Sequence, residues 1–333
     1  MILNPSILAL ILPSLLLSLL VGYAFFIGIR INEKWDIASG SELQLGLERR
    51  TYLISTIMNM ALGMQLVSLF LFIFTADALH TQLSGAMCAA GSLNANRYGY
   101  PVLLLKMLNF LLCGVWLVLN HVDNRAYDYP LIRPKYAFLK LLAPLILLET
   151  VIQLFYFLNL KSMILTTCCG SMFGPGGSSV TAAMVSLPPS IAALLFYCSM
   201  AAALAGGIYY LSTRKGVLVF SILASCALPV GIVSLVAFIS PYYYELPTHH
   251  CPFCILQGEY SYIGYPLYLT LLGGGLAGIS CGVLTLFREL ESLRSIVPAV
   301  QRRCAVVSVA LYIAFVSLVT WQLLFSGLRM IGV

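Results

Sequence analysis

The sequence predicts an all-α membrane protein that crosses the bilayer eight times. Of its 333 residues, 60% are hydrophobic and only 9% are charged, whereas soluble domains carry roughly a quarter charged residues. So few charges cannot cover a water-facing surface, and so much apolar mass excludes a disordered chain. The net charge of +6 is small and dispersed, so it gives no argument for a nucleic-acid partner. The lipid bilayer is the expected environment.

Eight apolar runs support this fold class. A helical span needs about 20 mostly apolar residues, and a soluble helix of that length would show a polar face. The first run has no basic residues before it and is too long for the apolar core of a signal peptide, so we expect a retained helix. The runs cover roughly residues 6–29, 53–76, 101–120, 138–160, 189–211, 216–239, 263–287 and 304–327.

The basic residues predict the orientation of these spans. Fourteen of the 18 Lys and Arg residues lie after spans 1, 3, 5 and 7. Cytoplasmic loops are enriched in basic residues, so both termini are expected on the non-cytoplasmic side, most simply of a bacterial inner membrane. The fourteen are Arg30, Lys34, Arg49, Arg50, Arg125, Arg133, Lys135, Lys140, Arg214, Lys215, Arg288, Arg294, Arg302 and Arg303.

The chain also indicates an internal duplication. A Gly-Tyr-Pro triplet opens the third span at Gly99 and the seventh at Gly264, and each triplet follows a cysteine at a similar distance. Each half would hold four spans in the same orientation, which is a parallel repeat. We therefore expect two four-helix halves, 1–162 and 189–333, joined by a Cys- and Gly-rich linker loop over 163–188.

The ten cysteines fall into two groups. Five lie in or at the ends of spans, where a cysteine is expected to pack as a small apolar residue: Cys113, Cys198, Cys226, Cys281 and Cys304. The other five lie in loops on the predicted non-cytoplasmic side: Cys88, Cys168, Cys169, Cys251 and Cys254. That side is oxidising in bacteria and in secretory compartments, so these five thiols are candidates for disulfide chemistry or for binding a soft metal.

The most informative motif is Cys251-Pro-Phe-Cys254, preceded by His249 and His250. Two cysteines at this spacing can close a small disulfide ring, and a nearby helix start lowers a thiol pKa. A neighbouring imidazole can accept the thiol proton. This pattern favours thiol–disulfide exchange.

The motif, together with Tyr265 and Pro266 after it, resembles the CxxC segment of the DsbB and vitamin K epoxide reductase families. This resemblance implies a membrane enzyme that passes electrons from protein thiols to a quinone. Cys251 and Cys254 would then be the pair nearest the quinone, and an outer loop would carry the shuttle cysteines.

Other interpretations of the same residues stay open. Cys88 can pair with Cys168 or Cys169, or Cys168 and Cys169 can pair with each other in a strained ring. Alternatively, Cys251–Cys254 or a link to Cys88 can be a fixed structural disulfide. The segment His249, His250, Cys251 and Cys254 offers nitrogen and sulfur ligands for zinc or copper. Haem is not expected, because the histidines precede the cysteine pair instead of following it.

Polar residues inside spans 3 and 4 form a second candidate site. Lys106 and Asn109 share one face of span 3, while Glu149 and Gln153 share a face of span 4. Charges within the bilayer are costly and often functional. We expect these four to line a quinone pocket, because Lys can donate to a quinone carbonyl and Glu can carry protons. Weaker candidates for the same face are Gln65 and Asp77.

The leading functional expectation is a membrane thiol:disulfide oxidoreductase linked to quinone. Electrons would come from a soluble thioredoxin-like or cytochrome-type partner on the non-cytoplasmic side and enter at Cys88, Cys168 or Cys169. The alternative is a non-enzymatic transporter, or a respiratory or assembly subunit, that binds a soft metal or a periplasmic redox partner.

Overall fold

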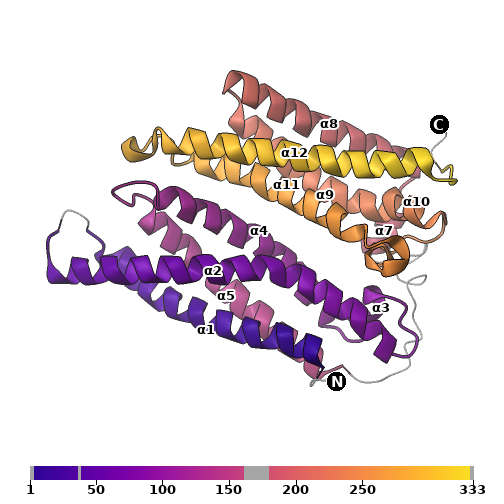
Figure 1. Cartoon of the computed structure of the whole chain (residues 1–333), viewed down its shortest axis with the longest axis horizontal. Coiled ribbons are helices and arrows are strands. Elements are labelled where there is room, and N and C mark those ends of the chain that lie inside the picture. Colours follow the sequence, from indigo (N-terminus) through magenta and orange to yellow (C-terminus); the bar gives the residue numbers. More distant parts are fainter. Residues whose placement is uncertain (1–3, 37–38, 161–179, 331–333) are drawn as a thin grey trace. The chain divides into compact units, whose positions relative to one another are not determined.

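The computed structural model describes residues 4–36, 39–160 and 180–330, and it confirms the all-α membrane fold. Within these residues, eight helical segments are long and apolar enough to cross a membrane, and no strand occurs. The long helices, shown in Figure 1, are α1 (Pro5–Lys34), α2 (Glu42–Ala78), α4 (Gly99–Asp123), α5 (Ile132–Leu158), α8 (Pro189–Thr213), α9 (Val217–Ser234), α11 (Gly264–Thr285) and α12 (Ile296–Phe325).

Local sequence signals explain several helix ends. The Asn4 side chain accepts a hydrogen bond from the Ser6 amide, and Pro5 occupies the first turn of α1. Asparagine caps an exposed amide, while proline fits a first helical position that needs no amide partner. Helix α8 likewise begins at Pro189.

Helix α5 begins earlier than predicted, because a buried ion pair stabilises its first turns. Lys135 lies in α5 and not in a loop, and it is 1% exposed. Its ammonium contacts the Asp123 carboxylate of α4 at 2.5 Å and the Asn120 amide oxygen at 3.0 Å. Lys135 is therefore a paired, buried charge.

Short elements follow α2 and α9. A 3₁₀ turn, η1 (Leu79–Gln82), and the helix α3 (Ala89–Asn94) come after α2. A π-helical turn, η2 (Leu235–Ile239), and α10 (Ser240–Tyr244) continue α9. Two further turns, η3 (Cys254–Leu256) and η4 (Gly258–Tyr260), precede α11.

The predicted linker is only partly covered by the structure. Helix α7 (Val180–Val185) lies within the range 163–188 that we expected to be a loop. Cys168 and Cys169 lie outside the described residues.

The chain forms two compact units whose boundaries differ from the predicted halves. The first unit comprises the described residues of 1–75, 96–161 and 286–300, and the second those of 76–95, 162–285 and 301–333. The segment 76–95, which carries Cys88, therefore packs with the second unit. The internal duplication stays a prediction.

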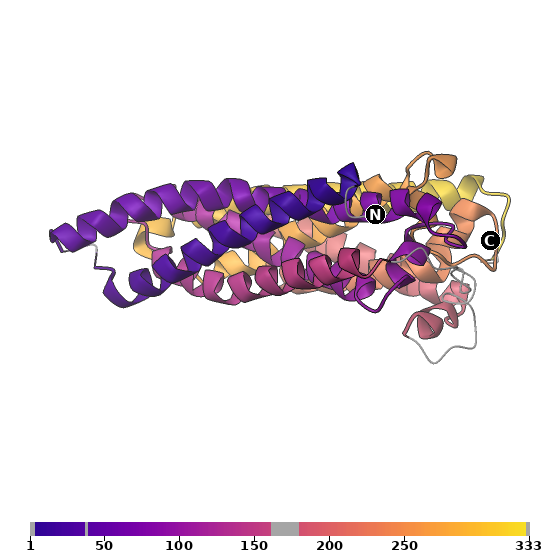
Figure 2. The same cartoon turned by 90° about the horizontal axis from the view of Figure 1, so that it is seen from below.

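The first unit is held by close packing of its long helices, which run alongside one another in Figure 1 and Figure 2. Helix α1 packs along α5, where Gly28 lets the Tyr136 ring approach the α1 backbone. The buried Trp116 of α4 donates to the Lys135 carbonyl of α5. These contacts centre on a continuous apolar cluster drawn from all four helices.

The second unit depends on small residues along α11. Gly278 faces Ala224 of α9, and Gly274 faces the Tyr312 ring of α12. The Ser308 hydroxyl donates to the Gly274 carbonyl at 2.7 Å, and the Tyr312 hydroxyl donates to the Ala224 carbonyl at 2.7 Å. Small residues let membrane helices approach closely enough for such contacts.

Replacing Gly278 by alanine is expected to lower the thermal stability of the protein in detergent. The new Cβ would lie 2.4 Å from the Ala224 Cβ, and overpacking of this kind costs about 1–3 kcal/mol. The matched control is Gly63→Ala, because nothing lies within 4 Å of a Cβ at Gly63. Equal melting temperatures for the two variants, measured by tryptophan fluorescence, would contradict this packing.

Candidate functional site

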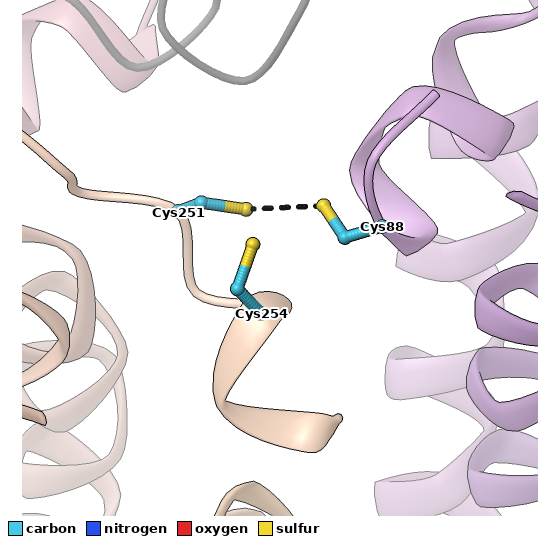
Figure 3. Close-up of side chains that lie close together, drawn as sticks. All are labelled: Cys88, Cys251 and Cys254. Atoms are coloured by element: carbon cyan, nitrogen blue, oxygen red, sulfur yellow. Dashed lines mark hydrogen bonds between the residues drawn. The ribbon is translucent and has the colours of Figure 1, made fainter. Parts of the chain in front are cut away.

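Three cysteines from two distant segments meet in the second unit. The sulfurs of Cys88, Cys251 and Cys254 all lie within 4.8 Å of one another. Cys88 Sγ and Cys251 Sγ are in hydrogen-bond contact at 3.6 Å, although 163 residues separate them. This distance exceeds the S–S bond length of about 2.05 Å. Figure 3 shows the three sulfurs directed into one space.

The Cys88 side of the cluster is positioned by the end of α2. Cys88 adopts an extended backbone just before α3. The next residue, Ala89, donates its amide to the Asp77 carboxylate at 3.1 Å. Asp77 thus fixes the start of α3, and with it the direction of the Cys88 side chain.

The CPFC loop, defined here as residues 245–263, is held by two tyrosines. The Tyr244 hydroxyl donates to the Cys251 carbonyl and accepts from the Ile255 amide, the latter at 2.9 Å. The Tyr268 hydroxyl of α11 donates to the Pro252 carbonyl at 2.6 Å. These bonds satisfy buried backbone groups on both sides of the cysteine pair and define the shape of the turn.

Gln257 joins the two cysteine-bearing segments. Its amide nitrogen donates to the Met87 carbonyl at 2.9 Å and to the Asp77 carboxylate at 3.3 Å. The same Asp77 oxygen accepts from the Ala89 amide. One side chain of the CPFC loop therefore bonds to the residue before Cys88 and to the carboxylate that accepts from the residue after it.

The two histidines have different roles. His249 Nε2 lies 3.4 Å from Cys254 Sγ, whereas His250 Nδ1 lies 3.0 Å from the Val236 carbonyl oxygen in η2. A carbonyl only accepts, so His250 Nδ1 carries a proton and is directed away from the sulfurs. Of the two, His249 is the imidazole beside the cluster.

Burial favours the neutral form of His249. Desolvation lowers the pKa of its imidazole, negative charge at Cys88 opposes this change, and the neighbouring His250 adds to it. The Tyr244 ring packs edge-on against the His249 ring, with centroids 4.5 Å apart. A neutral imidazole in this place can accept a thiol proton or donate a lone pair.

The cluster is shielded from solvent. Cys88 is 0% exposed, Cys251 is 1% exposed and Cys254 is 6% exposed. The sulfurs can react with one another or hold an ion without any large movement. Contact with a second protein requires the residues that cover the sulfurs to move.

Three of the four residues expected to form a quinone pocket meet in the first unit. The Lys106 ammonium contacts the Glu149 carboxylate at 2.7 Å, and the Asn109 amide donates to the other Glu149 oxygen at 2.6 Å. Gln65 donates to that same oxygen at 2.6 Å, and Lys106 also donates to the Ser68 hydroxyl at 2.7 Å. We call these five residues the Lys106–Glu149 network.

The polar groups of the network are bonded to one another. The Glu149 carboxylate already has three donors within the network, so a bound quinone would have to displace them. The space beside Gln65 and Ser68 measures about 40 Å³, and a larger, mostly apolar hollow of about 390 Å³ reaches Ser68 but none of the other four network residues. Gln153 instead donates to the Ser14 hydroxyl at 3.2 Å, and Asp77 bonds to Ala89 and Gln257.

The cysteines of the spans only partly follow the prediction. Cys113 and Cys281 are buried within the helix packing, and Cys304 is half-buried. Cys198 and Cys226 are exposed on α8 and α9, so the expectation of core packing is wrong for these two.

Sequence reasoning missed the residues that support the cysteine cluster. Tyr244 is part of a three-tyrosine run, which is typical of the aromatic belt at a membrane interface, yet it bonds to the CPFC turn. Gln257 carries no charge and belongs to no motif. Its position three residues after Cys254 is the only signal, and its partners are some 170 residues away.

Comparison with known proteins gives no relative for this chain: no protein-family profile, curated protein or solved structure matches it significantly.

The Tyr244→Phe substitution is expected to increase the reactivity of the buried cysteines. It removes the hydroxyl shared by the Cys251 carbonyl and the Ile255 amide, and unsatisfied buried groups cost about 1–3 kcal/mol. We expect maleimide labelling of Cys251 in the reduced protein to accelerate about 5–30-fold. Tyr243→Phe is the control, because the Tyr243 hydroxyl donates to the Leu318 carbonyl, outside the turn. Equal rates for the two variants would refute the role of Tyr244.

The Lys106–Glu149 network leads to a stability prediction. Glu149→Gln leaves the buried Lys106 ammonium without its counter-charge, and breaking such a pair costs about 3–5 kcal/mol. The double variant Lys106→Met with Glu149→Gln removes both charges and should regain most of that loss. The measurement is a denaturation series in detergent. A double variant no more stable than Glu149→Gln would show that the two charges are not coupled.

Proposed function

We propose that this chain is a membrane thiol:disulfide oxidoreductase whose Cys88, Cys251 and Cys254 exchange disulfide bonds. The observation that carries the proposal is the presence of three sulfurs within 4.8 Å of one another, supplied by two segments of the chain. Disulfide exchange within the chain needs a third sulfur close to a disulfide, whereas a structural disulfide needs only its own two sulfurs.

The exchange itself needs no outside reagent. When a Cys88 thiolate attacks the Cys251 sulfur of a Cys251–Cys254 disulfide, one S–S bond forms, one breaks, and Cys254 leaves as a thiolate. His249, 3.4 Å from Cys254 Sγ, is placed to exchange a proton with that sulfur.

Net turnover requires a donor and an acceptor. A soluble thioredoxin-like partner on the non-cytoplasmic side would supply two thiols and leave as a disulfide. Re-forming Cys251–Cys254 from two thiols releases two electrons and two protons, which a membrane quinone would take up as quinol. Because the sulfurs are buried, the partner reaches them only when the CPFC loop or the Cys88 segment opens.

Thiol trapping of the purified protein tests this function. The reduced protein is incubated with or without a short-chain quinone, quenched in acid, denatured and labelled with a maleimide. With quinone, Cys251 and Cys254 should lose their label as a pair, and adding a reduced soluble dithiol should restore it. Peptide mass spectrometry assigns the label to each cysteine.

Two variants complete this experiment. In Cys254→Ser, Cys251 should lose its label only together with Cys88, whose sulfur lies 3.6 Å away, whereas Cys198→Ser, which alters an exposed cysteine on α8, should leave the paired loss at Cys251 and Cys254 intact. If Cys251 and Cys254 keep the same redox state under all these conditions, the chain is not a thiol:disulfide oxidoreductase.

A further inference from the structure

We propose that the fully reduced cluster is also a tetrahedral binding site for a soft metal ion of the zinc type. Its ligands are the sulfurs of Cys88, Cys251 and Cys254 together with His249 Nε2. The site uses the same cysteines as the proposed exchange reaction, but it does not depend on that reaction.

The distances fit such a site. Zinc bonds of about 2.3 Å to sulfur and about 2.0 Å to nitrogen, arranged tetrahedrally, place two sulfurs about 3.8 Å apart and a sulfur and a nitrogen about 3.5 Å apart. Cys88 Sγ and Cys251 Sγ are 3.6 Å apart, and His249 Nε2 and Cys254 Sγ are 3.4 Å apart. The three sulfurs all lie within 4.8 Å of one another. The three sulfurs are therefore placed around one point, whereas His249 Nε2, which is near Cys254 but not within 4.8 Å of all three sulfurs, has to move toward the ion to complete the site.

The types of ligand atom and the residues around them are also those of a closed zinc site. Three thiols and one imidazole are the ligand types of closed zinc sites, and the sulfurs are almost completely buried. The Tyr244 ring supports the His249 ring, and the Tyr244 hydroxyl fixes the Cys251 backbone. Supporting contacts of this kind orient metal ligands and contribute to affinity.

His250 is outside the site even though it is adjacent to His249 in sequence. Its Nδ1 is held by the Val236 carbonyl in η2. The ligand set thus differs from the contiguous His249–Cys254 segment that the sequence offers, because Cys88 replaces His250.

Metal binding and disulfide formation exclude each other at this site. A disulfide between any two of the cysteines removes two thiolate ligands, so only the reduced cluster binds the ion. The ion in turn protects the thiols from oxidation. Oxidation should release the bound metal.

Cobalt(II) titration of the reduced, detergent-solubilised protein tests the site. We expect one equivalent of cobalt to bind with sulfur-to-cobalt charge-transfer absorption and the intense visible bands of tetrahedral coordination. Zinc should displace the cobalt. A reduced protein that shows no such spectrum would overturn the proposal.

Matched variants identify the ligands. His249→Ala should weaken cobalt binding by about 10–100-fold or more, whereas His250→Ala should leave it unchanged. Cys88→Ser should lower the charge-transfer intensity, and Cys198→Ser should not. A Cys88→Ser or His249→Ala variant with the wild-type spectrum would refute this ligand set.

The oxidised wild-type protein provides a test without any substitution. Its cobalt spectrum should vanish on disulfide formation and return on reduction, and persistence after complete oxidation would also refute the site. A negative cobalt titration would overturn the metal site alone, because the oxidoreductase is tested by quinone-dependent thiol trapping. The two proposals can therefore fail separately.

Discussion

The candidate site depends on one polar contact between distant parts of the chain. Gln257 of the CPFC loop donates to the Met87 carbonyl and to the Asp77 carboxylate, which also caps the Ala89 amide. These bonds engage backbone groups on both sides of Cys88. They link the Cys88 segment to the CPFC loop, and exchange or metal binding by the three sulfurs requires these two segments to stay together.

Two buried polar clusters in this protein differ in what they can do. In the Lys106–Glu149 network every charge faces a partner of opposite sign or a hydrogen-bonding amide, so it stabilises helix packing within a low-dielectric interior. The cysteine cluster instead brings together thiols that can form disulfide bonds with one another or coordinate one metal ion. The proposed chemistry therefore uses the sulfurs, and the quinone pocket expected at the network stays a prediction.

The sequence alone predicts the fold well, because long apolar runs have few alternatives to spanning helices. It also identifies the CPFC motif and the polar faces that carry Lys106 with Asn109 and Glu149 with Gln153, since helical spacing determines which side chains share a face. It does not choose the partner of Cys251, because proximity across 163 residues depends on tertiary packing. Nor does it separate His249 from His250, whose difference arises from the Val236 carbonyl.

The proximity of Cys88 to Cys251, on which both proposals rest, can be measured by disulfide cross-linking in native membranes. Membranes that contain the Cys254→Ser variant, in which Cys251 cannot pair with residue 254, are treated with copper phenanthroline, quenched with an alkylating reagent, digested and analysed by mass spectrometry. The structure predicts a disulfide-linked pair of peptides that joins Cys88 to Cys251. Complete oxidation of Cys251 with Cys88 recovered only as an alkylated thiol would contradict it.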